Sequence, residues 1–176
     1  MPYDMFIGIP VHRVLAVVAK SGLAPDGWIP VEKTNLGTRF PGVYAIGDVA
    51  AAYTAKAGTF AERAAQFVAD DIVANLRGTP PPGPYDGAGE CFMEFGRGEV
   101  AKMYADFLSG PKPTGVLMGP SVELAAEKAN FARCRQERWF SGLSSVELLR
   151  EAKRRQATSH IAMREANTGC PKTTVR

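Results

Sequence analysis

The sequence predicts an α/β fold, and three observations support that prediction. A short apolar segment, Val43 to Ile46, ends in Gly47-Asp48 and is typical of a buried strand. A long amphipathic helix pattern follows from Gly58 to Leu76. Two further apolar runs, 91–95 and 99–104, flank a glycine-rich turn and indicate a β-hairpin. Because strand and helix patterns alternate along the chain, we expect both in one mixed fold.

The composition is that of a globular protein with room for one ordinary core. The chain has 176 residues, of which 45% are hydrophobic and 22% charged. No apolar run reaches the roughly 18 residues of a membrane span, and the first residues show no signal-peptide pattern. We therefore expect a cytoplasmic protein, and peripheral attachment to a membrane is the alternative. The three cysteines and two histidines have no metal-ligand spacing, so no metal site is expected.

The first forty residues predict three short elements in order. Residues 3–9 form an apolar run that stops at Pro10 and indicates a buried strand, which would need neighbours on both sides. Residues 14–20 favour a short helix closed by Gly22. A turn then leads into a short strand over residues 28–31.

The helix from Gly58 to Leu76 has the clearest pattern in the chain. Gly78 follows it as a stop signal. Its apolar residues recur at helical spacing and predict one buried face, namely Phe60, Ala64, Phe67, Val68, Ile72 and Leu76. The next segment, 79–89, is too rich in Pro and Gly for regular structure. We place a boundary there, between a first domain at 1–82 and a second at 83–142.

The second domain, 83–142, is expected to be a hairpin followed by a helix. The hairpin turns at Gly96-Arg97-Gly98, and the helix spans 121–140 with Ser121 as its N-cap. A basic tail at 143–176 follows, which we expect to be helical from Ser144 and partly disordered.

Charge is distributed unevenly along the chain. Residues 1–127 hold 10 Lys and Arg against 14 Asp and Glu, a net −4, whereas residues 128–176 hold 11 against 4, a net +7. A basic segment of this kind is more often a solvated helix face than a binding site, so no nucleic-acid partner is expected. A membrane-surface or nucleic-acid module built on this tail stays open as an alternative.

A strand that ends in Gly-Asp has a chemical rationale at a dinucleotide site. Gly47 has no Cβ, so its backbone can approach a ribityl or pyrophosphate group, and the Asp48 carboxylate can accept a hydrogen bond from a sugar-like hydroxyl. The helix from Gly58 adds unpaired N–H groups and a positive dipole end. Together they would suit a ligand with hydroxyl groups and developing negative charge.

These residues resemble a known family. Thr38, followed after four residues by Val43-Tyr44-Ala45-Ile46-Gly47-Asp48, resembles the second FAD motif of the pyridine nucleotide-disulfide oxidoreductases. Residues 3–14, 21–36, 56–72 and 85–101 resemble segments of the sulfide:quinone oxidoreductase and flavocytochrome c sulfide dehydrogenase branch. The resemblance extends over residues 1 to about 140.

The resemblance implies an FAD-dependent oxidoreductase that transfers two electrons, with sulfide:quinone oxidoreductase as the nearest class. It implies cofactor contacts at Gly47, Asp48, Val49, Lys56 and Gly58. Ala55 stands where the family has a proline before the lysine, and a solvated Lys56 is the alternative there.

Cys91 is the candidate catalytic residue that the resemblance implies. In the sulfide-oxidising relatives a cysteine in this context belongs to a redox pair, whose partner lies in the N-terminal half. The simpler interpretation is a packing cysteine on an apolar strand.

The sequence contains no Gly-x-Gly-x-x-Gly, the pattern that cradles a dinucleotide pyrophosphate. We therefore expect an incomplete FAD/NAD(P)-binding, Rossmann-like three-layer fragment, truncated or half of a split enzyme. Its partner would be an N-terminal nucleotide-binding half or a second chain, and NAD(P) or a quinone would be further ligands of the complete enzyme. The isolated chain is expected to be inactive and to self-associate through exposed strand edges. An NADH:quinone-type flavoprotein fragment and a non-enzymatic remnant that binds a partner chain are the alternatives.

Overall fold

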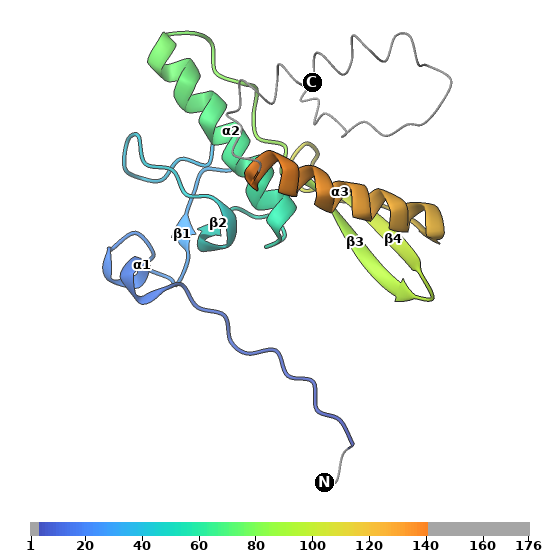
Figure 1. Cartoon of the computed structure of the whole chain (residues 1–176). Coiled ribbons are helices and arrows are strands. Elements are labelled where there is room, and N and C mark those ends of the chain that lie inside the picture. The colour runs from blue at the N-terminus through green and yellow to red at the C-terminus, as the bar shows by residue number, and fades with distance from the viewer. Residues whose placement is uncertain (1–3, 141–176) are drawn as a thin grey trace, which may run out of the picture. The chain divides into compact units, whose positions relative to one another are not determined.

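The structure is a computed structural model, and it describes residues 4–140. The predicted helix from Ser144 and the basic tail at 143–176 lie outside the described residues. The described chain contains both helices and strands, so the predicted mixed α/β class is confirmed (Figure 1).

The described chain divides into two compact units. The first comprises residues 4–91 and 103–117, and the second comprises residues 92–102 and 118–140. Three strands form one sheet in the order β3-β4-β5, and each contributes residues to both units: β3 (Ala88–Gly96), β4 (Glu99–Asp106) and β5 (Thr114–Ser121). The domain boundaries expected near residues 82 and 142 remain predictions.

The first unit opens with short elements. Helix α1 (Ala16–Lys20) and strand β1 (Ile29–Pro30) confirm the helix and the strand expected at these places. Strand β1 pairs in parallel with β2 (Ala50–Ala51), with Ile29 opposite Ala50. This pairing holds the segment before β1 beside the turn that leads into β2.

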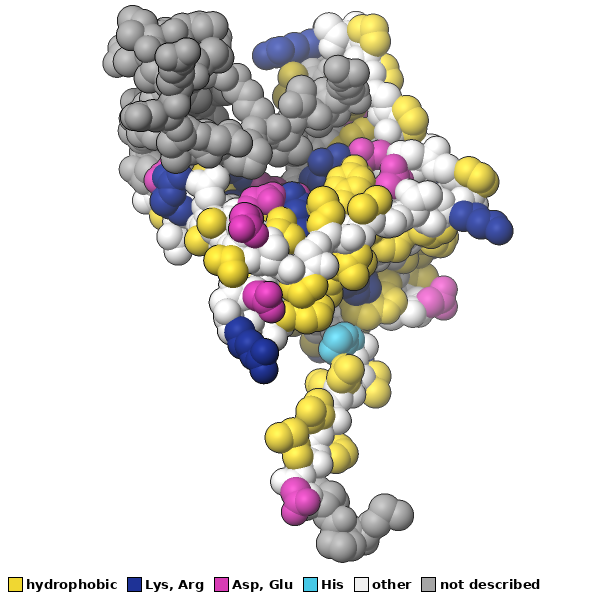
Figure 2. Space-filling model, turned by 90° about the vertical axis from the view of Figure 1, so that its right-hand side faces the viewer, with side chains coloured by type: hydrophobic (Ala, Val, Ile, Leu, Met, Phe, Trp, Pro, Cys, Tyr) yellow, Lys and Arg dark blue, Asp and Glu magenta, His cyan; other side chains and the backbone are white. Residues whose placement is uncertain are grey.

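Two predicted strands are not formed. Residues 4–9 have no strand structure and are exposed, because no described segment pairs with them and a lone strand leaves its backbone groups unsatisfied. Residues 43–46 form no strand and make a single antiparallel bridge, between Tyr44 and Gly37. Figure 2 shows the resulting row of uncovered hydrophobic side chains along the N-terminal arm.

Helix α2 (Gly58–Arg77) confirms the predicted helix. Gly78 adopts φ +63°, and the Thr79 N–H donates a hydrogen bond to the Ala74 carbonyl at 3.0 Å. This is a Schellman motif, whose left-handed residue is usually glycine because glycine has no Cβ to clash. The helix buries Phe60, Ala64, Val68, Asp71 and Ala74. The predicted face was wrong at Ile72 and Leu76, which are 40% and 82% exposed because the core of the first unit does not extend that far along the helix.

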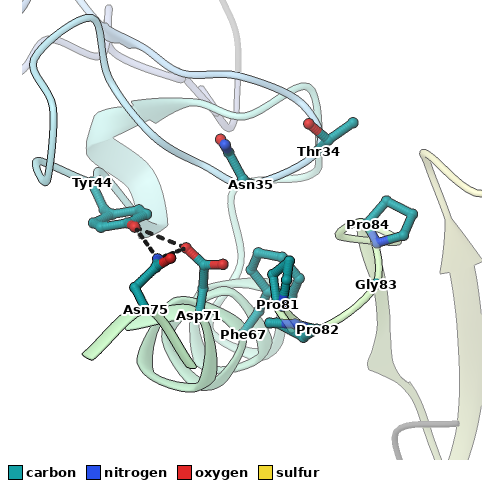
Figure 3. A pocket seen from close by; sticks show the side chains of 10 residues that line it. All are labelled: Thr34, Asn35, Tyr44, Phe67, Asp71, Asn75, Pro81, Pro82, Gly83 and Pro84. Carbon is teal, nitrogen blue, oxygen red and sulfur yellow. Dashed lines mark hydrogen bonds between the residues drawn. The ribbon is translucent and has the colours of Figure 1, made fainter. Parts of the chain in front are cut away.

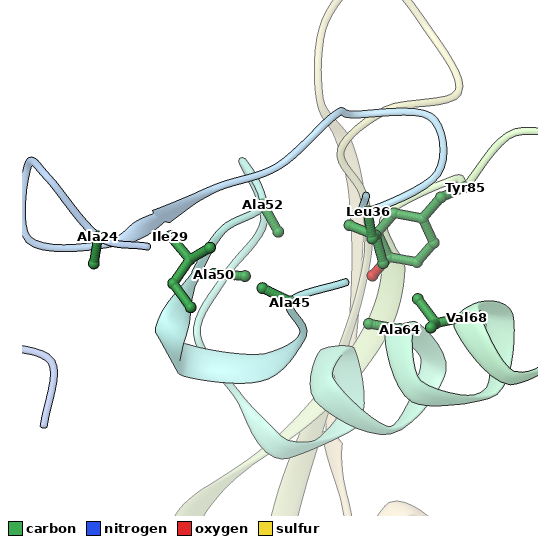
Figure 4. Packing of buried hydrophobic residues seen from close by; sticks show 9 residues of the cluster. All are labelled: Ala24, Ile29, Leu36, Ala45, Ala50, Ala52, Ala64, Val68 and Tyr85. Carbon is green, nitrogen blue, oxygen red and sulfur yellow. The ribbon is translucent and has the colours of Figure 1, made fainter. Parts of the chain in front are cut away.

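The core of the first unit is built mostly from small residues (Figure 4). Ala64 and Val68 of α2 lie towards Leu36 and Tyr85, and alanines from the neighbouring loops complete the cluster. Leu36 is fully buried although its φ is +59°. A left-handed leucine costs about 1–2 kcal/mol, and burial of its side chain contributes about 1.5–3 kcal/mol, which offsets that strain.

The second unit joins the hairpin end to helix α3 (Val122–Phe140). Strands β3 and β4 confirm the predicted hairpin, and Arg97 and Gly98 at φ +53° and +78° make the left-handed turn that matches strand twist. The Ser121 hydroxyl accepts the Leu124 N–H at 3.3 Å, which confirms the predicted N-cap. Phe92 packs edge-on against Phe131, with ring centroids 5.2 Å apart.

Candidate functional site

The Gly-Asp motif forms a tight turn rather than the end of a strand. Residues Gly47–Val49 make a short 3-10 helix, η1, which contacts α2. Gly47 adopts φ +69°, a backbone conformation that strongly favours glycine. A Cβ at Gly47 would lie 3.5 Å from the Ala61 Cβ, so the turn sits directly against the first turn of α2.

The N-terminus of α2 beside this turn has no side-chain cap. Ala57 is the N-cap, and within residues 4–140 no side chain accepts a hydrogen bond from the first N–H groups of the helix. No acidic residue lies in its first turn, which leaves the positive dipole end uncompensated within the helix. The Thr59 hydroxyl donates to the Glu90 carbonyl at 2.7 Å and thereby ties this end of α2 to β3.

Lys56 is held inside the loop that connects the turn to α2. Its Nζ donates to the backbone carbonyls of Asp48 at 2.6 Å and Ala50 at 2.9 Å. The same ammonium lies 4.0 Å from the ring centroid of Trp28, a cation–π contact. Lys56 therefore holds two backbone carbonyls of the turn and makes no hydrogen bond or ion pair with the Asp48 carboxylate.

The remaining predicted cofactor residues surround this turn in different settings. Asp48 is exposed, and its carboxylate makes no hydrogen bond within the described chain. Val49 is partly buried and packs against the core of the first unit. Gly58 is exposed, and a Cβ there would meet nothing within 4 Å, so this position has room for a side chain or a ligand atom. Asp48 and Gly58 are thus exposed, whereas Gly47 is half-buried against Ala61 of α2.

Cys91 lies on β3, half-buried and with a free thiol. Side chains two apart on a strand share a face, so Cys91 faces the same side as Gly89. A Cβ on Gly89 would lie 2.7 Å from Phe60 in the first turn of α2. The cysteine is therefore on the face of β3 that meets the N-terminal turn of α2.

An ion pair secures β3 beside α2. The Arg63 Nη2 lies 2.9 Å from the Asp86 Oδ2, and the Asp86 Oδ1 accepts the Ala88 N–H at 2.9 Å. The adjacent Tyr85 is buried, and this burial, with the Asp86 charge as a smaller cause, raises the pKa of Tyr85 to about 12. Asp86 thus ties the start of β3, the strand that carries Cys91, to α2.

Sequence reasoning missed three residues of this site. Trp28 meets Lys56 because β1 and β2 pair, and Thr59 meets Glu90 because α2 packs on β3. Ala61 touches the Gly47 turn. A small residue three positions after the helix start was the available signal for a close approach, whereas nothing local marked the other two.

The sequence of the chain is similar to that of a known protein. No protein-family model matches the chain. The chain is 29% identical over 114 residues to a mitochondrial sulfide:quinone oxidoreductase of Schizosaccharomyces pombe. This match supports a distant relation to the sulfide:quinone oxidoreductases. It covers 64% of this chain and 24% of that protein, so the chain spans about a quarter of its relative's length.

The described residues contain neither a cluster of metal ligands nor a membrane-spanning helix. No group of three His, Cys, Asp or Glu side chains in residues 4–140 is placed to hold a metal ion. No helix in that range is both long enough and apolar enough to cross a membrane.

Proposed function

We propose that this chain carries the flavin-facing part of an FAD-dependent oxidoreductase of the sulfide:quinone oxidoreductase type. Its first unit would be an incomplete segment of a Rossmann-like FAD-binding domain. The observation that carries the proposal is the left-handed Gly47 turn packed against the uncapped N-terminus of α2. The similarity to the fission yeast enzyme supports the same class.

The residues of the turn fit the sugar-like part of FAD. Gly47 presents backbone with no side chain in the way, and the exposed Asp48 carboxylate has acceptor capacity free for a ribityl hydroxyl. When bound, FAD would supply the two-electron redox chemistry of the proposed enzyme.

The N-terminus of α2 fits the pyrimidine edge of a flavin ring. Free N–H groups and the positive dipole end stabilise negative charge by about 0.3–1 kcal/mol at an exposed helix end. Gly58 adds no side chain at the start of this helix, and the space around its Cβ position is open. Lys56 would act as a positioning residue, because its ammonium holds the carbonyls of Asp48 and Ala50. Val49 would anchor the turn in the core.

The pyrophosphate and adenine of FAD would be bound by a partner of this segment. The chain has no glycine-rich phosphate loop, so we assign that role to an N-terminal nucleotide-binding half or to a second chain. NAD(P) or a quinone would be a further ligand of that complete enzyme.

Flavin binding by the chain tests this function. Riboflavin, FMN and FAD are each held at a fixed low concentration while the protein is titrated and flavin fluorescence anisotropy is recorded. We expect weak binding of similar strength for all three, because the chain contacts the ring and ribityl group but not the pyrophosphate. Asp48→Asn should weaken binding about tenfold, since it removes a charge-assisted hydrogen bond.

The matched control is Asp70→Asn, which neutralises another exposed carboxylate, on α2. It should leave flavin binding unchanged. No rise in anisotropy with any flavin would refute the proposal and favour a non-enzymatic remnant. A strong preference for FAD over riboflavin would show that the chain itself binds the pyrophosphate.

Within this proposal, Cys91 is the candidate redox cysteine. Its free thiol lies on the face of β3 that meets α2, which is compatible with reaction near the flavin. In the reconstituted complete enzyme, Cys91→Ser should abolish sulfide oxidation and preserve flavin binding. Turnover that survives this change would instead favour an NADH:quinone-type flavoprotein.

A further inference from the structure

A hollow of about 440 Å³ lies in the first unit, along the C-terminal half of α2 (Figure 3). Its lining includes Tyr44 from the segment before η1, Phe67, Asp71 and Asn75 from α2, and Pro81 and Pro82 from the loop that follows. Its size is within the range of small-molecule sites. None of the residues assigned to flavin lines it.

Asp71 is the charged group of this hollow. It is 7% exposed, and two donors bind the same carboxylate oxygen: Tyr44 Oη lies 2.8 Å from Oδ2, and Asn75 Nδ2 lies 3.2 Å from it. In Figure 3 the other oxygen points away from these two side chains. In the described part of the chain, no hydrogen bond or ion pair engages that second oxygen, Oδ1.

The two oxygens of the Asp71 carboxylate differ in their surroundings. Oδ2 accepts both neutral donors, whereas Oδ1 is not among the fully buried atoms and stays accessible from the hollow. Asp71 faces no Lys or Arg ion-pair partner among residues 4–140. The hydrogen bond from the phenol to Asp71 raises the pKa of Tyr44, with burial as a smaller cause, so the phenol stays a neutral donor. The hollow therefore presents a carboxylate and, among residues 4–140, has no Lys or Arg in its lining.

The walls of the hollow decide which cation would fit. The Phe67 ring is held in place by Tyr85, with centroids 5.4 Å apart, and the prolines form a rigid apolar side opposite the polar end. A hard metal ion needs several oxygen ligands, and the described residues bring no second carboxylate to this place. A cation on an alkyl stem fits both parts of the hollow. Its stem would pack on the apolar wall, and its charged head would meet the Asp71 carboxylate.

We propose that this hollow binds an organic cation, a primary ammonium or guanidinium group on a short alkyl stem, with its head on Asp71 Oδ1. Such a group is either a free small amine or the side chain of a lysine or arginine of another protein. Both sources present the same chemistry to the site, and the site is separate from the flavin-facing turn.

The test uses the full chain labelled with ¹⁵N and titrated with n-butylammonium chloride, followed by NMR. We expect saturable shifts that centre on the Tyr44 amide and on the amide and side-chain NH₂ of Asn75. The neutral isostere n-butanol should give none of these shifts. Equal effects of n-butanol, or shifts centred elsewhere in the chain, would overturn the proposal. This measurement on the unmodified protein decides the question even if a variant fails to fold.

Variants add a second test. Asp71→Asn keeps the shape and removes the charge, and it should weaken n-butylammonium binding at least tenfold because a charge-assisted contact is lost. The adjacent exposed Asp70→Asn is the matched control and should bind within twofold of the wild type. An unchanged affinity in folded Asp71→Asn would overturn the proposal.

A parallel titration with acetyl-Gly-Arg-Gly-amide separates the two sources of cation. Binding of either probe that depends on Asp71 supports the site. Tighter binding of the peptide assigns it to a side chain of a partner protein, and tighter binding of n-butylammonium assigns it to a free amine. Absence of Asp71-dependent binding with both probes would refute the site.

Discussion

Gly89 on β3 has no room for a side chain, and this gives a sharp prediction for Gly89→Ala. The new methyl carbon would lie 2.7, 2.8 and 2.9 Å from three ring atoms of Phe60. Carbon atoms in favourable contact are about 3.5–4.0 Å apart, so the ring must retreat by about 1 Å. Phe60 is 3% exposed and packs edge-on against Phe107 at a centroid distance of 5.6 Å, so it has no free direction in which to move.

The expected loss of stability follows from two opposing effects. Overpacking of this kind costs about 1–3 kcal/mol, whereas alanine is better than glycine in a strand by about 0.5–1 kcal/mol. We expect a net decrease of about 1–2 kcal/mol in the free energy of unfolding. Urea denaturation of the full chain, followed by circular dichroism, should show a lower midpoint at an unchanged slope.

Gly83→Ala is the matched control, because a Cβ at Gly83 meets nothing within 4 Å and its φ is not left-handed. It should be neutral or stabilise by about 0.4–1 kcal/mol. Phe60→Leu should cost less in the Gly89→Ala background than in the wild type, because the smaller side chain relieves the clash. Equal stability of Gly89→Ala and Gly83→Ala would show that β3 does not pack on α2 as described.

Three further predictions concern the turn, the helix end and alkaline stability. Lys56→Met should lower the free energy of unfolding by about 1 kcal/mol, because two hydrogen bonds at an exposed site are lost, and it should change Trp28 fluorescence; an unaltered spectrum would contradict the contact. Gly78→Ala should cost about 1–2 kcal/mol, because φ +63° is strained for alanine, as a thermal melt would record. Because the pKa of Tyr85 is raised to about 12, the unfolded chain ionises first and stability should fall as pH rises from about 10 towards 12. Tyr85→Phe should flatten that fall, and an equally steep fall in the variant would exclude Tyr85 as its cause.

Elements with strong local signals were predicted well from the sequence. Helix α2 combines a helical apolar period with Gly78, and the hairpin combines alternating strands with a left-handed Arg97-Gly98 turn. In both cases the residues that start, stop or turn the element lie within it. Local chemistry was therefore sufficient.

Strand formation was predicted less well, because it depends on partners far along the chain. Residues 4–9 and 43–46 are apolar enough for strands but find no ladder among the described residues beyond the single Tyr44 bridge. Strand β5 was missed because Gly115, Gly119 and Pro120 suggest a loop, although an edge strand tolerates them. Apolar composition alone does not determine pairing.

The candidate site was predicted in part. The motif located the turn at Gly47 and Asp48 and the start of α2 at Gly58, and the turn contacts that helix. The roles of Trp28 and Thr59 arise from tertiary contacts and carry no local signal. Asp71 interrupts the apolar face of α2, and its burial beside Tyr44 became visible only from the fold.

The central claim is that the Gly47–Val49 turn and the N-terminus of α2 form a flavin-facing surface. A chemical-shift map of the ¹⁵N-labelled chain with riboflavin tests it most directly. We predict the largest shifts at the amides of Gly47, Asp48, Gly58 and Thr59, and none at Asn75, which lies in the second half of the same helix. Shifts centred on Asn75 and Tyr44, or no saturable shifts at all, would contradict the claim.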